Sequence, residues 1–240
     1  MKRVNQLAIG ILLLGQAISF GTLAAPVTLV GNTVDFTFDS SLLGQFGSPG
    51  VSGNTLFFTP VAFEAQAFNG LAFDLAKETM NIKVTAHSGH GLNTLNLLER
   101  GDYLLFGAAS SVDVTGQIRA FDLANPNVDL TAGISTLAPV TTVGLPTHNW
   151  TASAALNLAS LDAVAANVTV QNLLIAKSFS ADSFAFIEKK YVGLSVGTLA
   201  ITPVPEAQTY AMLLAGLGLV AGSVMRRRTM QTRAESIIES

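Results

Sequence analysis

The clearest strand pattern of the chain is Ser111-Val-Asp-Val-Thr-Gly-Gln-Ile-Arg-Ala120, in which apolar and polar side chains alternate. Successive side chains of a β-strand point to opposite faces, so this pattern predicts a strand with one buried and one solvated face. The same alternation occurs at residues 80–86 and 167–171. Strands that are buried on one side only are typical of antiparallel sheets.

Further strand-like runs are separated by turn clusters of Gly, Asn, Pro and Ser. They lie at residues 27–29, 34–38, 55–63, 103–106, 128–131, 180–187 and 191–201. About ten short strands with turns between them predict an all-β body, an antiparallel β-sandwich or flattened barrel. Residues 152–166 are the one candidate for a helix in the body, although Leu156, Leu158 and Leu161 fit a strand almost as well.

The size and composition of the chain indicate one exported domain. Roughly 180 residues lie between two apolar ends, enough for one core and too few to require two. The chain has no cysteine, so packing must stabilise it without disulfides. The two terminal segments hold six of its 13 basic and three of its 16 acidic residues, which leaves the body acidic. An acidic body repels nucleic acid, so we expect no nucleic-acid partner.

The N-terminus has the pattern of a secretory signal peptide. Lys2 and Arg3 precede an apolar stretch at residues 7–20 and a small-residue segment that ends at Ala25. Proline after the cut hinders a peptidase, and Pro26 follows Ala25, so we predict cleavage after Ala24. We therefore assign residues 1–24 to the signal peptide, with the Sec export machinery and signal peptidase as partners, and residues 25–203 to the extracytoplasmic domain.

The C-terminal segment predicts a membrane helix. No residue from Tyr210 to Met225 is charged, and the run stops at Arg226, Arg227 and Arg228. Sixteen residues of helix span roughly 24 Å, so this transmembrane helix is a marginal anchor for a hydrocarbon core of ~30 Å. The three arginines hold their end in the cytoplasm by the positive-inside bias. Residues 229–240 are then a short cytoplasmic tail, and all that precedes the helix is outside.

Residues 204–228 resemble the PEP-CTERM sorting signal of Gram-negative bacteria, in which a short motif precedes an apolar span and an arginine cluster. Val204, Pro205, Glu206 and Ala207 form the motif here, with Ala207 where the family most often has a second proline. The resemblance implies that a membrane protease-transpeptidase, an exosortase, processes the protein at the outer face and frees it from the anchor. The alternative is an ordinary single-pass tail anchor. Residues 31–53, 145–151 and 185–196 also look like parts of PEP-CTERM cargo proteins, which are implied to serve in extracellular matrix or exopolysaccharide.

Several short motifs fit chemistry only in part. Gly193-Leu-Ser-Val-Gly197 matches the nucleophile elbow of hydrolases, yet it lies in an alternating strand and no histidine follows it. His87 and His90 could bind a metal only if His148 came near. Asp39, Asp102 and Asp122 are turn residues that could hold calcium, although no calcium-loop motif is present.

We therefore predict a non-enzymatic surface or extracellular matrix protein that is associated with exopolysaccharide and has no catalytic, cofactor or metal residues. The alternatives are a calcium-assisted carbohydrate-binding module and an extracytoplasmic hydrolase. Trp150, the only tryptophan, lies in a polar stretch that suggests a partly exposed ring. It is the best single candidate for glycan contact, because sugars stack on such rings.

The arginine cluster makes a prediction about topology. A reporter fused after Ser240 should be cytoplasmic, and one inserted near Pro203 should be extracytoplasmic, because the arginines retain the C-terminal end inside. Protease protection in intact spheroplasts measures both positions. Two reporters on the same side of the membrane would contradict the anchor.

Overall fold

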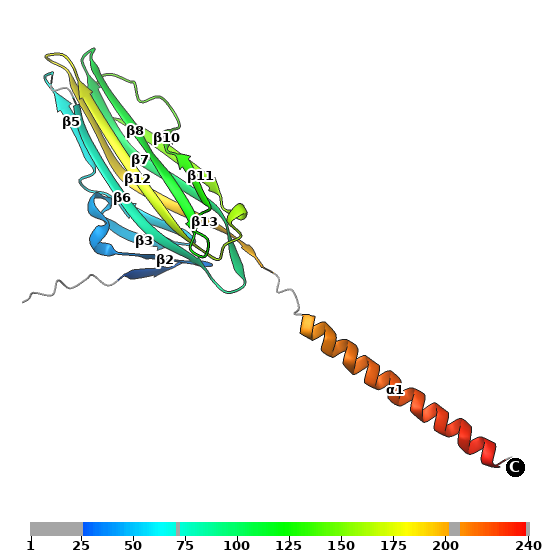
Figure 1. Cartoon of the computed structure of the whole chain (residues 1–240). Helices are drawn as coiled ribbons and strands as arrows, with labels where there is room; N and C mark the ends of the chain where they lie inside the picture. Colours follow the sequence, from blue (N-terminus) through cyan, green and yellow to red (C-terminus); the bar gives the residue numbers. More distant parts are fainter. Residues whose placement is uncertain (1–25, 71–72, 202–206, 239–240) are drawn as a thin grey trace, which may run out of the picture.

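The computed structural model describes residues 26–70, 73–201 and 207–238, and the side chains of residues 210–226 within the C-terminal helix. The predicted signal peptide and the motif residues Val204, Pro205 and Glu206 lie outside the described residues. In the described part, strands form two antiparallel sheets that face each other (Figure 1). Two separate sheets make the body a sandwich rather than a flattened barrel, and they confirm the predicted β-class.

The first sheet has six strands in the order β1-β2-β6-β12-β8-β9. Their bounds are β1 (Val27–Val30), β2 (Val34–Phe38), β6 (Phe73–Ala86), β12 (Ala165–Ser178), β8 (Ser110–Asp122) and β9 (Asp129–Gly133). β12 lies at its centre and pairs along its whole length with β6 on one side and β8 on the other. Its residues alternate without a break between half-buried and buried.

The second sheet has seven strands in the order β10-β11-β7-β13-β4-β3, with β5 also paired to β13. Their bounds are β10 (Ser135–Thr136), β11 (His148–Asn157), β7 (His90–Phe106), β13 (Phe184–Ala200), β4 (Thr55–Thr59), β3 (Ser48–Ser52) and β5 (Glu64–Phe68). Single-turn 3₁₀ helices complete the body: η1 (Ser40–Leu42), η2 (Gly44–Phe46) and η3 (Ala159–Leu161).

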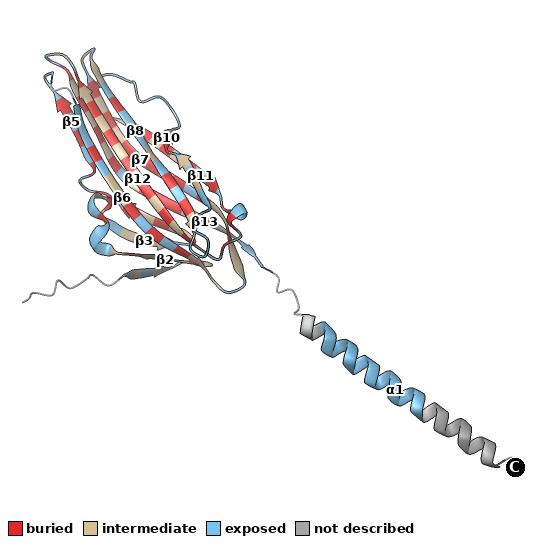
Figure 2. Ribbon diagram, in the orientation of Figure 1, coloured by how far each residue is buried: buried red, intermediate tan, exposed pale blue. Residues whose placement is uncertain are grey.

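The core lies between the sheets and consists of the inward rows of both. Phe36 and Val168 enter it from the first sheet, and Phe58 and Leu95 from the second, each with no exposed surface. Figure 2 shows the alternation of buried and exposed residues along the strands. Burial of a phenylalanine or leucine side chain stabilises the fold by about 1.5–3 kcal/mol, so these rows carry most of the stability.

Several predicted boundaries were wrong, because the longest strands extend beyond the predicted runs and β13 joins two of them. Three of the differences have identifiable local reasons. β4 ends at Thr59 instead of continuing to residue 63, because Pro60 has no N–H for the ladder. β13 begins at Phe184 rather than residue 180, because Asp182 is left-handed (φ 63°) in the preceding turn. Residues 152–166 divide into the end of β11, the short η3 and the start of β12, so the ambiguous segment is mostly strand.

β13 contains a bulge that decides which of its side chains face the core. Lys189 lies opposite Gly101 of β7 and Tyr191 lies opposite Arg100, which leaves Lys190 as the extra residue. A bulge shifts the alternation of a strand by one residue. Lys189 therefore points inward, Lys190 and Tyr191 both point outward, and Val192 is again buried.

The C-terminal helix α1 spans Ala207–Ile238. All its described side chains are exposed (Figure 2). Within the described residues, no helix is both long and apolar enough to cross a membrane. The predicted transmembrane helix is thus not confirmed.

The two faces of β4 give a test of the packing. Phe58 is fully buried, whereas its neighbour Phe57 is half-buried on the outer face. Phe58→Ala should lower the free energy of unfolding by about 3–5 kcal/mol, because it leaves a cavity among well-packed rings. Phe57→Ala should cost less than half of that. Denaturant unfolding followed by the fluorescence of Trp150 measures both, and equal losses would contradict the assignment of the two faces.

Candidate functional site

The predicted sorting residues fall only partly within the described chain. Val204, Pro205 and Glu206 lie outside it, and Ala207 is the first residue of α1. Arg226, Arg227 and Arg228 belong to the same helix, and the side chain of Arg226 is exposed. The structure therefore adds no geometry to the motif itself.

Trp150 corrects an expectation from the sequence. The residue is only 3% exposed, and its Nε1 donates a hydrogen bond of 3.1 Å to the Glu188 carbonyl. The polarity of its neighbours arises from the alternation of β11, in which Asn149 faces outward and Trp150 inward. The prediction of a partly exposed ring was wrong, so we do not assign glycan contact to Trp150.

The three histidines do not come together. His90 begins β7, and His148 pairs with Tyr103 near the other end of this 17-residue strand. At ~3.4 Å per residue the separation is roughly 40 Å, too far for a shared metal ion. His87 instead lies 2.9 Å from the Asp35 carboxylate, measured from Nε2 to Oδ1.

The three aspartates considered for calcium lie in separate elements and have their own donors. Asp39 accepts hydrogen bonds from the hydroxyl and the N–H of Ser41, which lower its pKa. Asp122 accepts from the N–H of Ala124, and Asp102 pairs with Lys190. Among the described residues, no three His, Asp or Glu side chains are grouped as metal ligands.

The G-x-S-x-G match lies within β13, as the alternation predicted. Ser195 accepts a hydrogen bond of 3.1 Å from the Thr55 hydroxyl. Gly193 serves packing, because a side chain there would collide with the ring of Tyr191. The strand context does not provide the sharp turn that an elbow needs.

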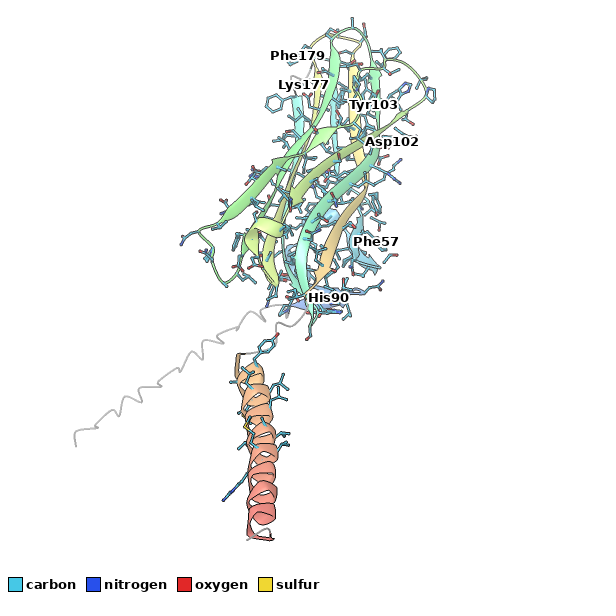
Figure 3. The ribbon with its side chains drawn as sticks, turned by 90° about the vertical axis from the view of Figure 1, so that its right-hand side faces the viewer. Phe57, His90, Asp102, Tyr103, Lys177 and Phe179 are labelled. Atoms are coloured by element: carbon cyan, nitrogen blue, oxygen red, sulfur yellow. The ribbon has the colours of Figure 1, made fainter. Side chains whose placement is uncertain are left out.

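Tyr191 belongs to an aromatic platform, by which we mean Phe57, Tyr191 and Arg100 on the outer face of the second sheet. The rings of Phe57 and Tyr191 are stacked, with centroids 6.4 Å apart and planes 15° from parallel. Cζ of Arg100 lies 5.9 Å from the centroid of Tyr191. Figure 3 shows Phe57 along one side of the sandwich. Gly50 makes room for the Phe57 ring as Gly193 does for Tyr191, so both rings lie close to the sheet.

A cluster of three charged side chains, Lys190, Asp102 and Glu188, lies next to the platform. Nζ of Lys190 lies 2.7 Å from Oδ2 of Asp102 and 2.8 Å from Oε1 of Glu188. Hydrogen bonds to these two carboxylates raise the pKa of Lys190 to about 12. Burial raises the pKa of Glu188, against the opposing effect of Lys190. The outer face thus places aromatic rings beside groups that can exchange hydrogen bonds with a polar ligand.

Farther along, an aromatic row crosses three strands of the same sheet. Phe184 of β13 pairs with Phe68 of β5 and with Phe106 of β7. Phe68 and Phe106 are 43% and 55% exposed. Cross-strand partners point to the same face of a sheet, so these three rings form one aromatic row.

The second polar arrangement lies inside the core. Nζ of Lys189 donates hydrogen bonds of 2.6 Å to Oε2 of Glu99 on β7 and to Oδ1 of Asn172 on β12. We call these three residues the buried triad. Lys189 and Glu99 come from the second sheet and Asn172 from the first, so the triad connects the two sheets. The side chains of Lys189 and Glu99 have no exposed surface, and Asn172 is fully buried.

Two aromatic rings lie close to the ammonium of the triad. Nζ of Lys189 lies 5.0 Å from the ring centroid of Phe63 and 5.8 Å from that of Trp150. The Trp150 ring lies against Gly101, where a side chain would collide with it. Desolvation lowers the pKa of Lys189, against the opposing charge of Glu99. Two buried atoms of the triad, Oε1 of Glu99 and Nδ2 of Asn172, have no hydrogen-bond partner.

Sequence reasoning identified neither arrangement, although one signal was present. Asn172 lies on the apolar phase of β12, between Val170 and Leu174, where a polar side chain must be buried. The sequence could not identify the partners of Asn172, because Glu99 and Lys189 lie on other strands and are 90 residues apart. The platform depends in the same way on strand pairing that no local pattern specifies.

Comparison with solved structures gives only weak likenesses. An enzymatically active domain of tailspike protein 4 from bacteriophage CBA120 is 10% identical, with a TM-score of 0.20, and the match covers 70% of this chain and 18% of that one. Eiger TNF from S. frugiperda is 12% identical, with a TM-score of 0.21 and coverage of 60% and 96%. Likenesses this weak support no conclusion about function. No curated protein matches the sequence.

The C-terminal segment does match a family model. Residues 203–228 match the PEP-CTERM protein-sorting motif. They include the Pro-Glu pair, the uncharged run and the three arginines on which the resemblance was based. The chain is therefore a PEP-CTERM domain-containing protein.

Proposed function

We propose that this protein is exported, processed by an exosortase and released to the cell surface or extracellular matrix, where its body binds exopolysaccharide without catalysis. The sorting motif at residues 203–228 supports the export and the processing. The aromatic platform supports the binding. In this proposal α1 is the transient membrane anchor, with Arg226 at its cytoplasmic side.

The platform has the features that a saccharide ligand requires. The apolar C–H face of a sugar ring stacks on an aromatic face, and its hydroxyl groups need donors and acceptors at the rim. Phe57 and Tyr191 supply stacked rings on the outer face. Arg100 and the carboxylate of Glu188 supply the rim. An extended sheet face suits a linear chain of sugars better than a single residue.

Calcium-assisted binding is the less favoured alternative. Asp102 and Glu188 already share the ammonium of Lys190 at 2.7 and 2.8 Å, so a cation there would have to displace it. Hydrolysis lacks support at the platform, because the one motif serine, Ser195, takes part in a strand contact with Thr55. Binding by stacking requires neither the displacement of Lys190 nor a catalytic serine.

Removal of one platform ring should weaken polysaccharide binding. Tyr191→Ala should reduce affinity for exopolysaccharide of the producing cells at least about tenfold, or ~1.4 kcal/mol, because it removes half of the stack. The matched control is Phe121→Ala on the first sheet, where Cζ of Arg119 lies 5.3 Å from the Phe121 ring. Affinity electrophoresis in gels that contain the polysaccharide measures both variants. Equal retention of wild type and Tyr191→Ala would exclude the platform as the polysaccharide-binding surface.

The motif carboxylate should control processing rather than membrane insertion. A protease that reads Glu206 must pair it with a donor, and loss of one half of a buried pair typically costs several kcal/mol. Glu206→Gln should therefore leave full-length precursor in the membrane fraction. Ala207→Pro, which restores the usual motif, should be processed at least as well as wild type. Blots of membrane and extracellular fractions compare them, and release of Glu206→Gln at the wild-type rate would refute exosortase recognition.

A further inference from the structure

The buried triad has the composition of a reaction site rather than of a simple ion pair. It places an amine, a primary amide and a carboxylate in contact inside the core, with the amine and amide on different sheets. We propose that Lys189 and Asn172 form a covalent amide cross-link between β13 and β12, with Glu99 as the proton carrier. The proposal does not depend on polysaccharide binding or on exosortase processing.

The nucleophile and its target are already close. Nζ of Lys189 lies 2.6 Å from Oδ1 of Asn172. A carbonyl bond is about 1.23 Å long, so Nζ lies no more than roughly 3.8 Å from the amide carbon Cγ. Both side chains extend from strands in the middle of packed sheets. Such fixed geometry raises the effective concentration of the two groups by orders of magnitude.

Burial prepares the amine for attack. An ammonium has no lone pair, so Lys189 must first lose a proton. Desolvation, which lowers the pKa of Lys189, favours the neutral amine. Oε2 of Glu99, 2.6 Å from Nζ, is the nearest acceptor for that proton. Proton transfer also removes two opposite charges from a core in which both are costly.

The reaction is a transamidation that balances without any oxidant or reductant. Nζ of Lys189 attacks Cγ of Asn172, the C–N bond to Nδ2 breaks, and Nδ2 leaves as ammonia. Of the three protons of the ammonium, one stays on the new amide nitrogen. One passes through Glu99 to the leaving Nδ2, and one remains on the Glu99 carboxyl group. The protonated carboxyl group can stabilise the oxyanion on Oδ1 during the attack.

The product removes defects that the unreacted triad carries. Buried polar atoms are nearly always hydrogen-bonded, yet Oε1 of Glu99 and Nδ2 of Asn172 have no partner. The reaction expels Nδ2 and leaves a neutral Glu99 whose hydroxyl can donate to the new amide oxygen. Lys189 and Asn172 have essentially no exposed surface, so the product bond is shielded from water and from hydrolysis.

The cross-link has a definite signature in the mass of tryptic peptides. The full-length chain, purified after expression and held at neutral pH, is unfolded and digested with trypsin. Trypsin cleaves after Arg119, Lys177 and Lys190, but not after a lysine whose amine is acylated. We expect a branched species that joins residues 120–177 to residues 178–190 and is lighter than their sum by one ammonia. Fragmentation should place the branch at Asn172 and Lys189.

Variants assign the roles of the three residues. Asn172→Ala and Glu99→Gln should give no branched species. Asn172→Asp should restore it with the wild-type product mass, because water then leaves instead of ammonia. Lys190→Arg, a change at the adjacent residue on the outer face, should leave the branch unchanged.

The wild-type protein decides the proposal even if a variant fails to fold. Wild-type peptides that are separate and retain the full mass of their sequence would show that the triad is only a buried ion pair. A branched species in Glu99→Gln at the wild-type yield would contradict the role of Glu99 as the proton carrier.

Discussion

In β13, the three consecutive residues Lys189, Lys190 and Tyr191 share two positions of the ladder with β7. This bulge shifts the alternation of the strand, so that Lys189 enters the core while Tyr191 lies on the outer face. A regular strand would turn one of these side chains to the wrong side. The buried triad and the aromatic platform therefore both depend on one extra residue.

The surroundings of the bulge keep it in place. Gly101, opposite Lys189, has no side chain, because the Glu188 carbonyl and the Trp150 ring occupy that space. Trp150 donates its indole N–H to the same carbonyl. Trp150, which the sequence suggested as a glycan contact, instead packs in the core, and the proposed binding surface contains Tyr191.

A core that contains a lysine needs a physical reason. The chain has no cysteine, so no disulfide can join its two sheets. The triad is the place where charged and polar side chains of both sheets meet at full burial. A buried ion pair with two unsatisfied atoms is a poor stabiliser, whereas an amide between the sheets would tie them together outside the cell.

The sequence predicted what depends on local alternation and missed what depends on pairing. The β-class, the span of β2 and much of β8 follow from period-two patterns, and the C-terminal motif follows from its residues. Long strands such as β7 were underestimated, because Glu99 and Gly101 interrupt the apolar pattern for reasons of tertiary contact. The inward orientation of Lys189 could not be predicted, because the bulge in β13 has no local signature in the sequence.

The most direct test of this account is a high-resolution crystal structure of the full-length protein, with electron density examined at the buried triad. The account predicts continuous density from Nζ of Lys189 to Cγ of Asn172, at an amide C–N length of about 1.33 Å, with Nδ2 gone. Separate side chains, with Nζ still 2.6 Å from an intact amide oxygen, would contradict it.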